Sequence, residues 1–150
     1  MENIDENFML EAIKEAGIGK SAGNLPFGSV IVFNNEIISK GHAEDSLSGD
    51  ITRHAELIAI ERACETLSKD ELSKCTIYST NEPCIMCTGA ILNSGILSVV
   101  IGVSRGDMPN NFKPKKINFG DLVANSPEEI KVTRGILKDK IIPLFNEVNK

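Results

Sequence analysis

Two short motifs carry the side chains best suited to chemistry in this sequence of 150 residues. The first is His54-Ala55-Glu56, and the second is Pro83-Cys84-Ile85-Met86-Cys87. Imidazole nitrogens and cysteine thiolates are common zinc ligands in proteins, and a carboxylate beside such a metal can transfer protons. We therefore expect the two motifs to meet at one zinc ion.

The spacing of the cysteines suits a metal site at the start of a helix. Cys84 and Cys87 are three residues apart, so on one helix they share a face. The free N–H groups and the dipole of a first helical turn favour thiolate over thiol, and zinc requires thiolate. If His54 also stands at a helix start and the two starts converge, the metal gains one nitrogen and two sulfur ligands.

Three protein ligands leave the fourth tetrahedral position for water, which is typical of a catalytic zinc site. Bound zinc lowers the pKa of that water toward about 7. Glu56, two residues after the histidine, can take the proton of the water, deliver it to a ring nitrogen and assist the departure of ammonia. A His-x-Glu motif followed by Pro-Cys-x-x-Cys matches the signature of zinc deaminases. The sequence therefore predicts hydrolytic deamination.

The other two cysteines leave a structural alternative open. Cys64 or Cys75 could complete a closed site of three cysteines and one histidine that only braces the fold. Cys64 falls on the apolar face of a predicted helix, and Cys75 begins a predicted strand, so both are expected to be small core residues. Without a secretion signal, metal binding or catalysis is favoured over disulfides.

The composition indicates one globular domain over residues 1–150, with 41% hydrophobic and 25% charged residues. A net charge of −5 disfavours a broad nucleic-acid surface, and the small cluster of Lys113, Lys115 and Lys116 is expected to be a solvated loop. No apolar run approaches the roughly 20 residues that span a bilayer. The polar, acidic start gives no signal peptide, so a cytoplasmic location is expected.

The hydrophobic pattern predicts strands and helices in alternation around the two motifs, as in a layered α/β fold. A helix through Phe8 is expected to stop at Gly17, and the turn pair Asn34-Asn35 is expected to join two strands in a hairpin. The other expected elements are helices over 54–68, 84–93 (buried on several sides) and around Pro143, strands over 28–33, 36–39, 75–80, 97–103 and 129–133, and loops over 42–50 and 105–116.

The chain resembles the zinc-dependent cytidine and purine deaminase superfamily, closest to the branch with bacterial tRNA adenosine deaminases, guanine deaminases and fungal cytosine deaminase. The resemblance lies in Leu25-Pro26-Phe27-Gly28, in residues 50–56, in residues 82–89 and in residues 132–137. It implies a three-layer α/β/α, cytidine deaminase-like fold with a central five-stranded mixed sheet, a catalytic zinc and a homodimer. His54, Cys84 and Cys87 match the ligands, and Glu56 matches the proton shuttle.

The resemblance also implies contacts to a substrate. The backbone N–H of Ala55 would face a substrate carbonyl or ring atom, and the carbonyl of Glu82 would accept from the leaving amine. Phe27 falls where a pocket side chain often lies. In the loop after the predicted strand 97–103, Asp107 would either contact a purine N–H or form a turn.

One position departs from the family pattern. Relatives usually place an asparagine that binds the substrate ring shortly after the hairpin, and Ala43 stands there in this chain. A side chain that both donates and accepts is therefore missing. We expect His42 or Asp45 to read the substrate in its place.

Three functions follow from these features. The first is a zinc-dependent deaminase of a free nucleobase, nucleoside or related heterocycle, guanine- or cytosine-like. The second is a tRNA wobble-adenosine deaminase, favoured by the resemblance of residues 132–137 and by the small lysine cluster. The third is a catalytically inactive, zinc-stabilised binding protein, for which the absent asparagine is the one indication.

Overall fold

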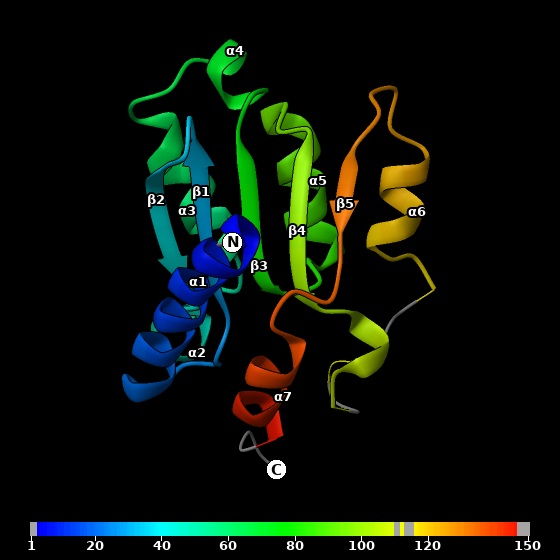
Figure 1. The fold of residues 1–150 in the computed structure, drawn as a ribbon. Coiled ribbons are helices and arrows are strands. Elements are labelled where there is room, and N and C mark those ends of the chain that lie inside the picture. The colour runs from blue at the N-terminus through cyan, green and yellow to red at the C-terminus, as the bar shows by residue number, and fades with distance from the viewer. Residues whose placement is uncertain (1–2, 110–111, 113–115, 147–150) are drawn as a thin grey trace.

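Five strands form one mixed sheet at the centre of the computed structural model, which describes residues 3–109, 112 and 116–146 (Figure 1). They are β1 (Gly28–Phe33), β2 (Glu36–His42), β3 (Thr76–Asn81), β4 (Ser98–Val103) and β5 (Lys131–Thr133). Their spatial order is β2-β1-β3-β4-β5. Strand β1 runs antiparallel to β2 and β3, whereas β3, β4 and β5 are parallel.

Helices cover both faces of this sheet, which confirms the predicted three-layer fold. Helices α1 (Ile4–Ser21) and α7 (Lys138–Asn146) lie on one face, and α3 (Ala55–Cys64), α5 (Ile85–Ser94) and α6 (Phe119–Ala124) lie on the other (Figure 1). Neighbouring strand residues alternate between the layers: Ile77 packs with the α3 and α5 side, and Tyr78 with the α1 and α7 side. Among the helices described, none is long and apolar enough to cross a membrane.

Local signals placed several elements correctly. Asn34 and Asn35 have φ of 51° and 62°, the left-handed conformations that a tight hairpin turn requires, and they join β1 to β2. Gly95 ends α5 with φ of 89°. The predicted strand 97–103 is β4, whose residues from Val99 onward are buried between two parallel neighbours.

The predicted stop of the first helix at Gly17 is wrong, because α1 continues to Ser21. Gly19 faces the ring of His42, and a Cβ at this glycine would lie 3.1 Å from that ring. Gly19 thus allows close packing of the helix on β2, and Gly17 does not terminate the helix.

The predicted burial of Cys64 is also wrong: its side chain is exposed at the end of α3. The buried side of this helix runs through Ile60 to Ala63, so the next residue is turned about 100° away from the core. Cys75, in contrast, is buried as predicted. Helix α5 is less enclosed than expected, since Ile85 is 46% exposed.

The hydrophobic pattern did not predict the short helices, because each of them buries too few residues to show a helical period. They are α2 (Asp45–Ser48), α4 (Lys69–Leu72), α6 and the 3-10 turn η1 (Arg105–Asp107). Capping boxes start α4 at Ser68 and α6 at Asn118. Helix α7 begins at Lys138, so Pro143 lies inside it and not near its start.

Two glycine substitutions test the packing of α1 on the sheet. A Cβ at Gly28 would lie 2.1 Å from the carbonyl oxygen of Ala12 in α1, whereas one at Gly17 would meet nothing within 4 Å. Gly28→Ala is therefore expected to lower the free energy of unfolding by about 1–3 kcal/mol. Gly17→Ala should raise it by about 0.5–1 kcal/mol, because alanine favours a helix interior. Urea unfolding checks both values, and a neutral Gly28→Ala would contradict the close packing.

Candidate active site

The sheet topology brings the two sequence motifs to one edge. Strand β2 has the same direction as β3, since both are antiparallel to β1. The chain leaves both strands at the same edge, continues from β2 through α2 to α3, and passes from β3 into α5. His54 is the N-cap of α3 and Cys84 is the N-cap of α5, and neither side chain makes a capping hydrogen bond. Both side chains are thus free to act as ligands.

The three predicted ligands lie together at these helix starts. His54 Nδ1 is 3.5 Å from Cys84 Sγ and 3.5 Å from Cys87 Sγ, and the three atoms lie within 4.8 Å of one another. A nitrogen and a sulfur on one tetrahedral zinc lie about 3.6 Å apart, given bond lengths of about 2.0–2.1 and 2.3 Å. The donor set therefore fits zinc.

The remaining cysteines do not join this group in the part of the chain that the structure describes. Cys75 donates its thiol hydrogen to the carbonyl of Glu71 over 3.5 Å, and burial raises its pKa to about 11. Cys64 is exposed. These placements argue against the closed site of three cysteines and one histidine.

The electrostatics of the ligands favour a cation between them. A hydrogen bond from Cys87 and the contact with His54 together lower the pKa of Cys84 to about 3. The same bond and burial raise the pKa of Cys87, and the bond with Cys84 raises the pKa of His54. The two sulfur atoms and the imidazole nitrogen thus compete for a proton at close range. A divalent cation in its place would satisfy all three at once.

Glu56 lies in the first turn of α3 and is 3% exposed. Burial raises its pKa to about 7, and the negative Cys84 raises it as well, whereas His54 and Arg105 lower it. The carboxyl group of Glu56 therefore lies near the ligands, but it does not belong to the group of residues that could hold a metal. A carboxyl that titrates near neutrality can both take and release a proton.

Glu82 lies in a charged cluster that the sequence did not reveal. Its carboxylate accepts from Arg134 Nη1 over 2.5 Å and from the backbone N–H of Arg105 over 3.3 Å. Its carbonyl, the predicted acceptor for the leaving amine, accepts from Arg105 Nη2 over 2.6 Å. Arg134 lies within residues 132–137, which resemble the tRNA adenosine deaminase branch, but no local spacing relates it to a residue 52 positions earlier.

Three other predicted residues lie in buried or half-buried surroundings. Phe27 packs edge-to-face with Phe112 and Phe145, at centroid distances of 5.3 and 5.5 Å. Ala55 is the first residue of α3 and is buried. Ala43 is 1% exposed, and its N–H donates to the Phe27 carbonyl over 3.1 Å. Ala43 therefore fills space and holds the loop, and its methyl group cannot read a substrate.

Two predicted residues are engaged outside the group of ligands. His42 Nδ1 lies 3.1 Å from Glu15 of α1, so its ring faces the helix that covers the other side of the sheet. Asp107 Oδ2 pairs with Lys138 Nζ over 3.0 Å. Lys116 is exposed, whereas Lys113 and Lys115 lie outside the described residues.

Comparison with known proteins agrees with this geometry. Residues 2–103 match the cytidine and deoxycytidylate deaminase zinc-binding region. A tRNA-specific adenosine deaminase of Bacillus subtilis is 35% identical, with 97% of this chain and 91% of the relative aligned. A probable cytosine deaminase of Schizosaccharomyces pombe is 32% identical, over 92% and 88%. The solved guanine deaminase of Nitrosomonas europaea is 27% identical, with a TM-score of 0.77 and coverage of 95% and 82%.

Proposed function

Because this chain belongs to the cytidine and deoxycytidylate deaminase family, whose members are zinc-dependent hydrolases, we propose that it deaminates a free nucleobase, nucleoside or related heterocycle, guanine- or cytosine-like. The convergence of His54, Cys84 and Cys87 beside a buried Glu56 carries the proposal. In the net reaction, water adds to the ring carbon that bears the amino group. Ammonia leaves, and a carbonyl group remains.

The proposed mechanism divides the work among the chain's residues. His54, Cys84 and Cys87 would hold zinc, which when bound supplies a Lewis acid that activates water. Glu56 would take a proton from the attacking water and pass it to a ring nitrogen. The same carboxyl would then take the remaining proton of that water oxygen and deliver it to the departing amine, so that ammonia leaves as a neutral molecule and the oxygen becomes the carbonyl.

Backbone groups would orient the substrate. The N–H of Ala55, at the start of α3, is proposed to donate to a substrate carbonyl or ring nitrogen, with Phe27 against the ring. The carbonyl of Glu82 accepts from Arg105 Nη2 over 2.6 Å and from Asn81 Nδ2 over 3.4 Å. The leaving amine would replace the long Asn81 contact on one lone pair, while Arg105 holds the carbonyl in place through the other.

The charges around the site support a small substrate over a polyanion. Arg53 pairs with Glu44 over 3.1 Å and with Glu61 over 3.5 Å, and Arg134 pairs with Glu82. These arginines are neutralised by carboxylates of the same chain. A phosphate backbone would need cations that are available to it.

Ammonia release from guanine, cytosine, adenine, cytidine and triazine-like compounds tests the proposed substrate class, with zinc-loaded protein. We expect turnover of at least one free base or nucleoside, with little dependence on salt. Absence of turnover on every compound would overturn the proposal.

Deamination of the wobble adenosine of tRNA is the second candidate. The 35% identity to a tRNA-specific adenosine deaminase, over nearly the whole chain, favours it. It predicts conversion of an anticodon stem-loop to inosine, with a rate that falls steeply as salt rises. No inosine at saturating enzyme would remove this candidate.

We also propose that the chain forms a homodimer through the surface beside the site. Leu47, Ile51 and Ile85 are 65%, 79% and 46% exposed, and they come from the segments that carry the ligands. Large apolar side chains in such numbers are typical of an interface. Sedimentation should give a dimer for the wild type and a monomer for Ile51→Glu, and a monomeric wild type would contradict the proposal.

A further inference from the structure

We propose that Asp45 is a positioning residue for the metal ligand His54: its carboxylate accepts a hydrogen bond from Nε2–H and keeps Nδ1 turned toward Cys84 and Cys87. The inference rests on the zinc site of the proposed function. It adds a role for a residue that the sequence suggested only as a reader of the substrate.

The first observation is the placement of the imidazole ring. Nδ1 of His54 faces both cysteine sulfurs at 3.5 Å, while Nε2 lies 3.6 Å from Asp45 Oδ2. A neutral histidine that ligates through Nδ1 must carry its proton on Nε2. The carboxylate therefore lies on the side of the ring where that proton must be.

The second observation is an unsatisfied atom. Among the side-chain nitrogen and oxygen atoms that the structure describes, Asp45 Oδ1 is the one that is buried without a hydrogen-bond partner. Buried unsatisfied polar groups are rare in native proteins, and each requires an explanation. His54 Nε2 lies 3.6 Å from the other oxygen, Oδ2, just beyond hydrogen-bond distance. A small rotation of the carboxyl group would bring one of its oxygens within reach of a protonated Nε2.

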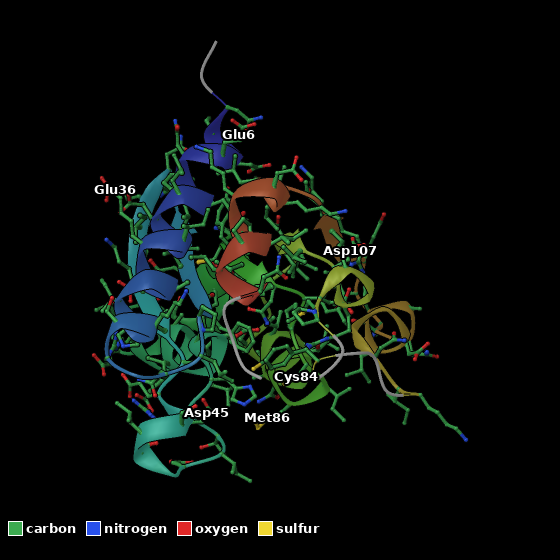
Figure 2. The ribbon with its side chains drawn as sticks, turned by 90° about the horizontal axis from the view of Figure 1, so that it is seen from below. Glu6, Glu36, Asp45, Cys84, Met86 and Asp107 are labelled. Atoms are coloured by element: carbon green, nitrogen blue, oxygen red, sulfur yellow. The ribbon has the colours of Figure 1, made fainter. Side chains whose placement is uncertain are left out.

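The third observation is the construction of the loop that carries both residues. The backbone N–H of Glu44 donates to the carbonyl of Arg53 over 2.9 Å, and their side chains pair over 3.1 Å. These two residues directly precede Asp45 and His54, so the double link holds the carboxylate and the ring side by side. In Figure 2, Asp45, Met86 and Cys84 are all labelled in the lower part of the view.

A capping role does not explain Asp45. It is the first residue of α2, a helix of only four residues, and the side chain of the preceding N-cap residue makes no capping hydrogen bond. The geometry instead resembles the carboxylate–histidine–metal arrangement of known zinc sites, in which the carboxylate fixes the orientation of the ring.

Zinc affinity tests the proposal through two substitutions at this position. Competition with a chelator should show zinc bound about 10–100-fold more weakly by Asp45→Ala. Asp45→Asn should fall between the wild type and Asp45→Ala, because its amide oxygen still accepts a hydrogen bond. Asp50→Asn is the matched control: it removes the same charge from the same loop, and its amide oxygen can still accept from Thr52. This control should leave the affinity within about twofold.

Nitrogen NMR of the imidazoles gives a readout that a merely structural role would not change. The chain has only two histidines, so the signals of His42 and His54 can be assigned by single substitutions. In the zinc-loaded wild type, the Nε2 proton of His54 should exchange slowly with water. Asp45→Ala should make it exchange rapidly, whereas Asp50→Asn should not.

The outcomes separate this inference from the proposed function. If the wild type binds zinc and deaminates but Asp45→Ala keeps its zinc affinity and its slow Nε2 proton, only the role of Asp45 is overturned. If zinc leaves the Nδ1 signal of His54 unchanged in the wild type, the metal site and the inference fail together. Thermal unfolding of the metal-free variants shows whether each is folded. If Asp45→Ala does not fold, the comparison of Asp45→Asn with the wild type still tests the proposal.

Discussion

Replacing Glu56 by glutamine is expected to lower the deamination rate by about 10²–10⁴-fold while zinc stays bound. Glutamine has nearly the same shape as glutamate, but its amide cannot take or release a proton at neutral pH. Glu56 is 3% exposed and lies outside the group of ligands, so the change removes proton transfer without removing a metal contact. Rate and zinc content, measured on the same sample, check the expectation.

Glu61→Gln is the matched control for this experiment. Glu61 lies on the exposed side of the same helix and contacts Arg53 at 3.5 Å. We expect its substitution to leave the rate within about twofold. If Glu56→Gln deaminates the substrate as fast as the wild type, the proposed role of this carboxyl group in proton transfer is wrong. An inactive zinc-stabilised binding protein would show no deamination to lose in either variant.

The ligands could be predicted from the sequence because the information lies in local motifs. His54 and Cys84 each stand at a helix start, and the pattern that begins each helix is visible within a few residues. Cys87 follows from the spacing alone. The order of the strands brings the two motifs together. The family resemblance implied this arrangement, whereas the hydrophobic pattern did not predict it.

Side-chain pairs between distant segments could not be predicted in this way. Glu82 and Arg134 are 52 residues apart and meet because the parallel strands β3, β4 and β5 end at one edge of the sheet, where the arginine after β5 reaches past the end of β4. Asp45 and His54 are nearer in the chain, but their approach depends on a link through Glu44 that no helical or strand period encodes.

The exposed Cys64 shows a different limit. A helical face read from the sequence is uncertain by one residue, and one residue rotates a side chain by about 100°. Ala63 is buried and Cys64 is exposed, so this rotation decides which of the two neighbours packs in the core. The tertiary packing of α3 on β2 settles the choice, and that packing is absent from the pattern.

Substituting the ligand Cys87 should have the second large effect. Cys87→Ala is expected to weaken zinc binding by roughly 10²–10³-fold, since zinc sites gain about 10–16 kcal/mol from all of their ligands together. Activity should be lost with the metal. Cys75→Ala is the matched control, because this thiol is also buried but lies outside the group of metal ligands.

Thermal unfolding with and without zinc distinguishes a lost ligand from a damaged core. Zinc at about 100 times its dissociation constant should stabilise the wild type by about 2.7 kcal/mol, because it binds only the folded chain. Cys75→Ala should lower the unfolding temperature but keep this increment, whereas Cys87→Ala should lose the increment. A Cys87→Ala protein that zinc still stabilises fully would show that His54 and Cys84 hold the metal without it, and the three-ligand site would then be wrong.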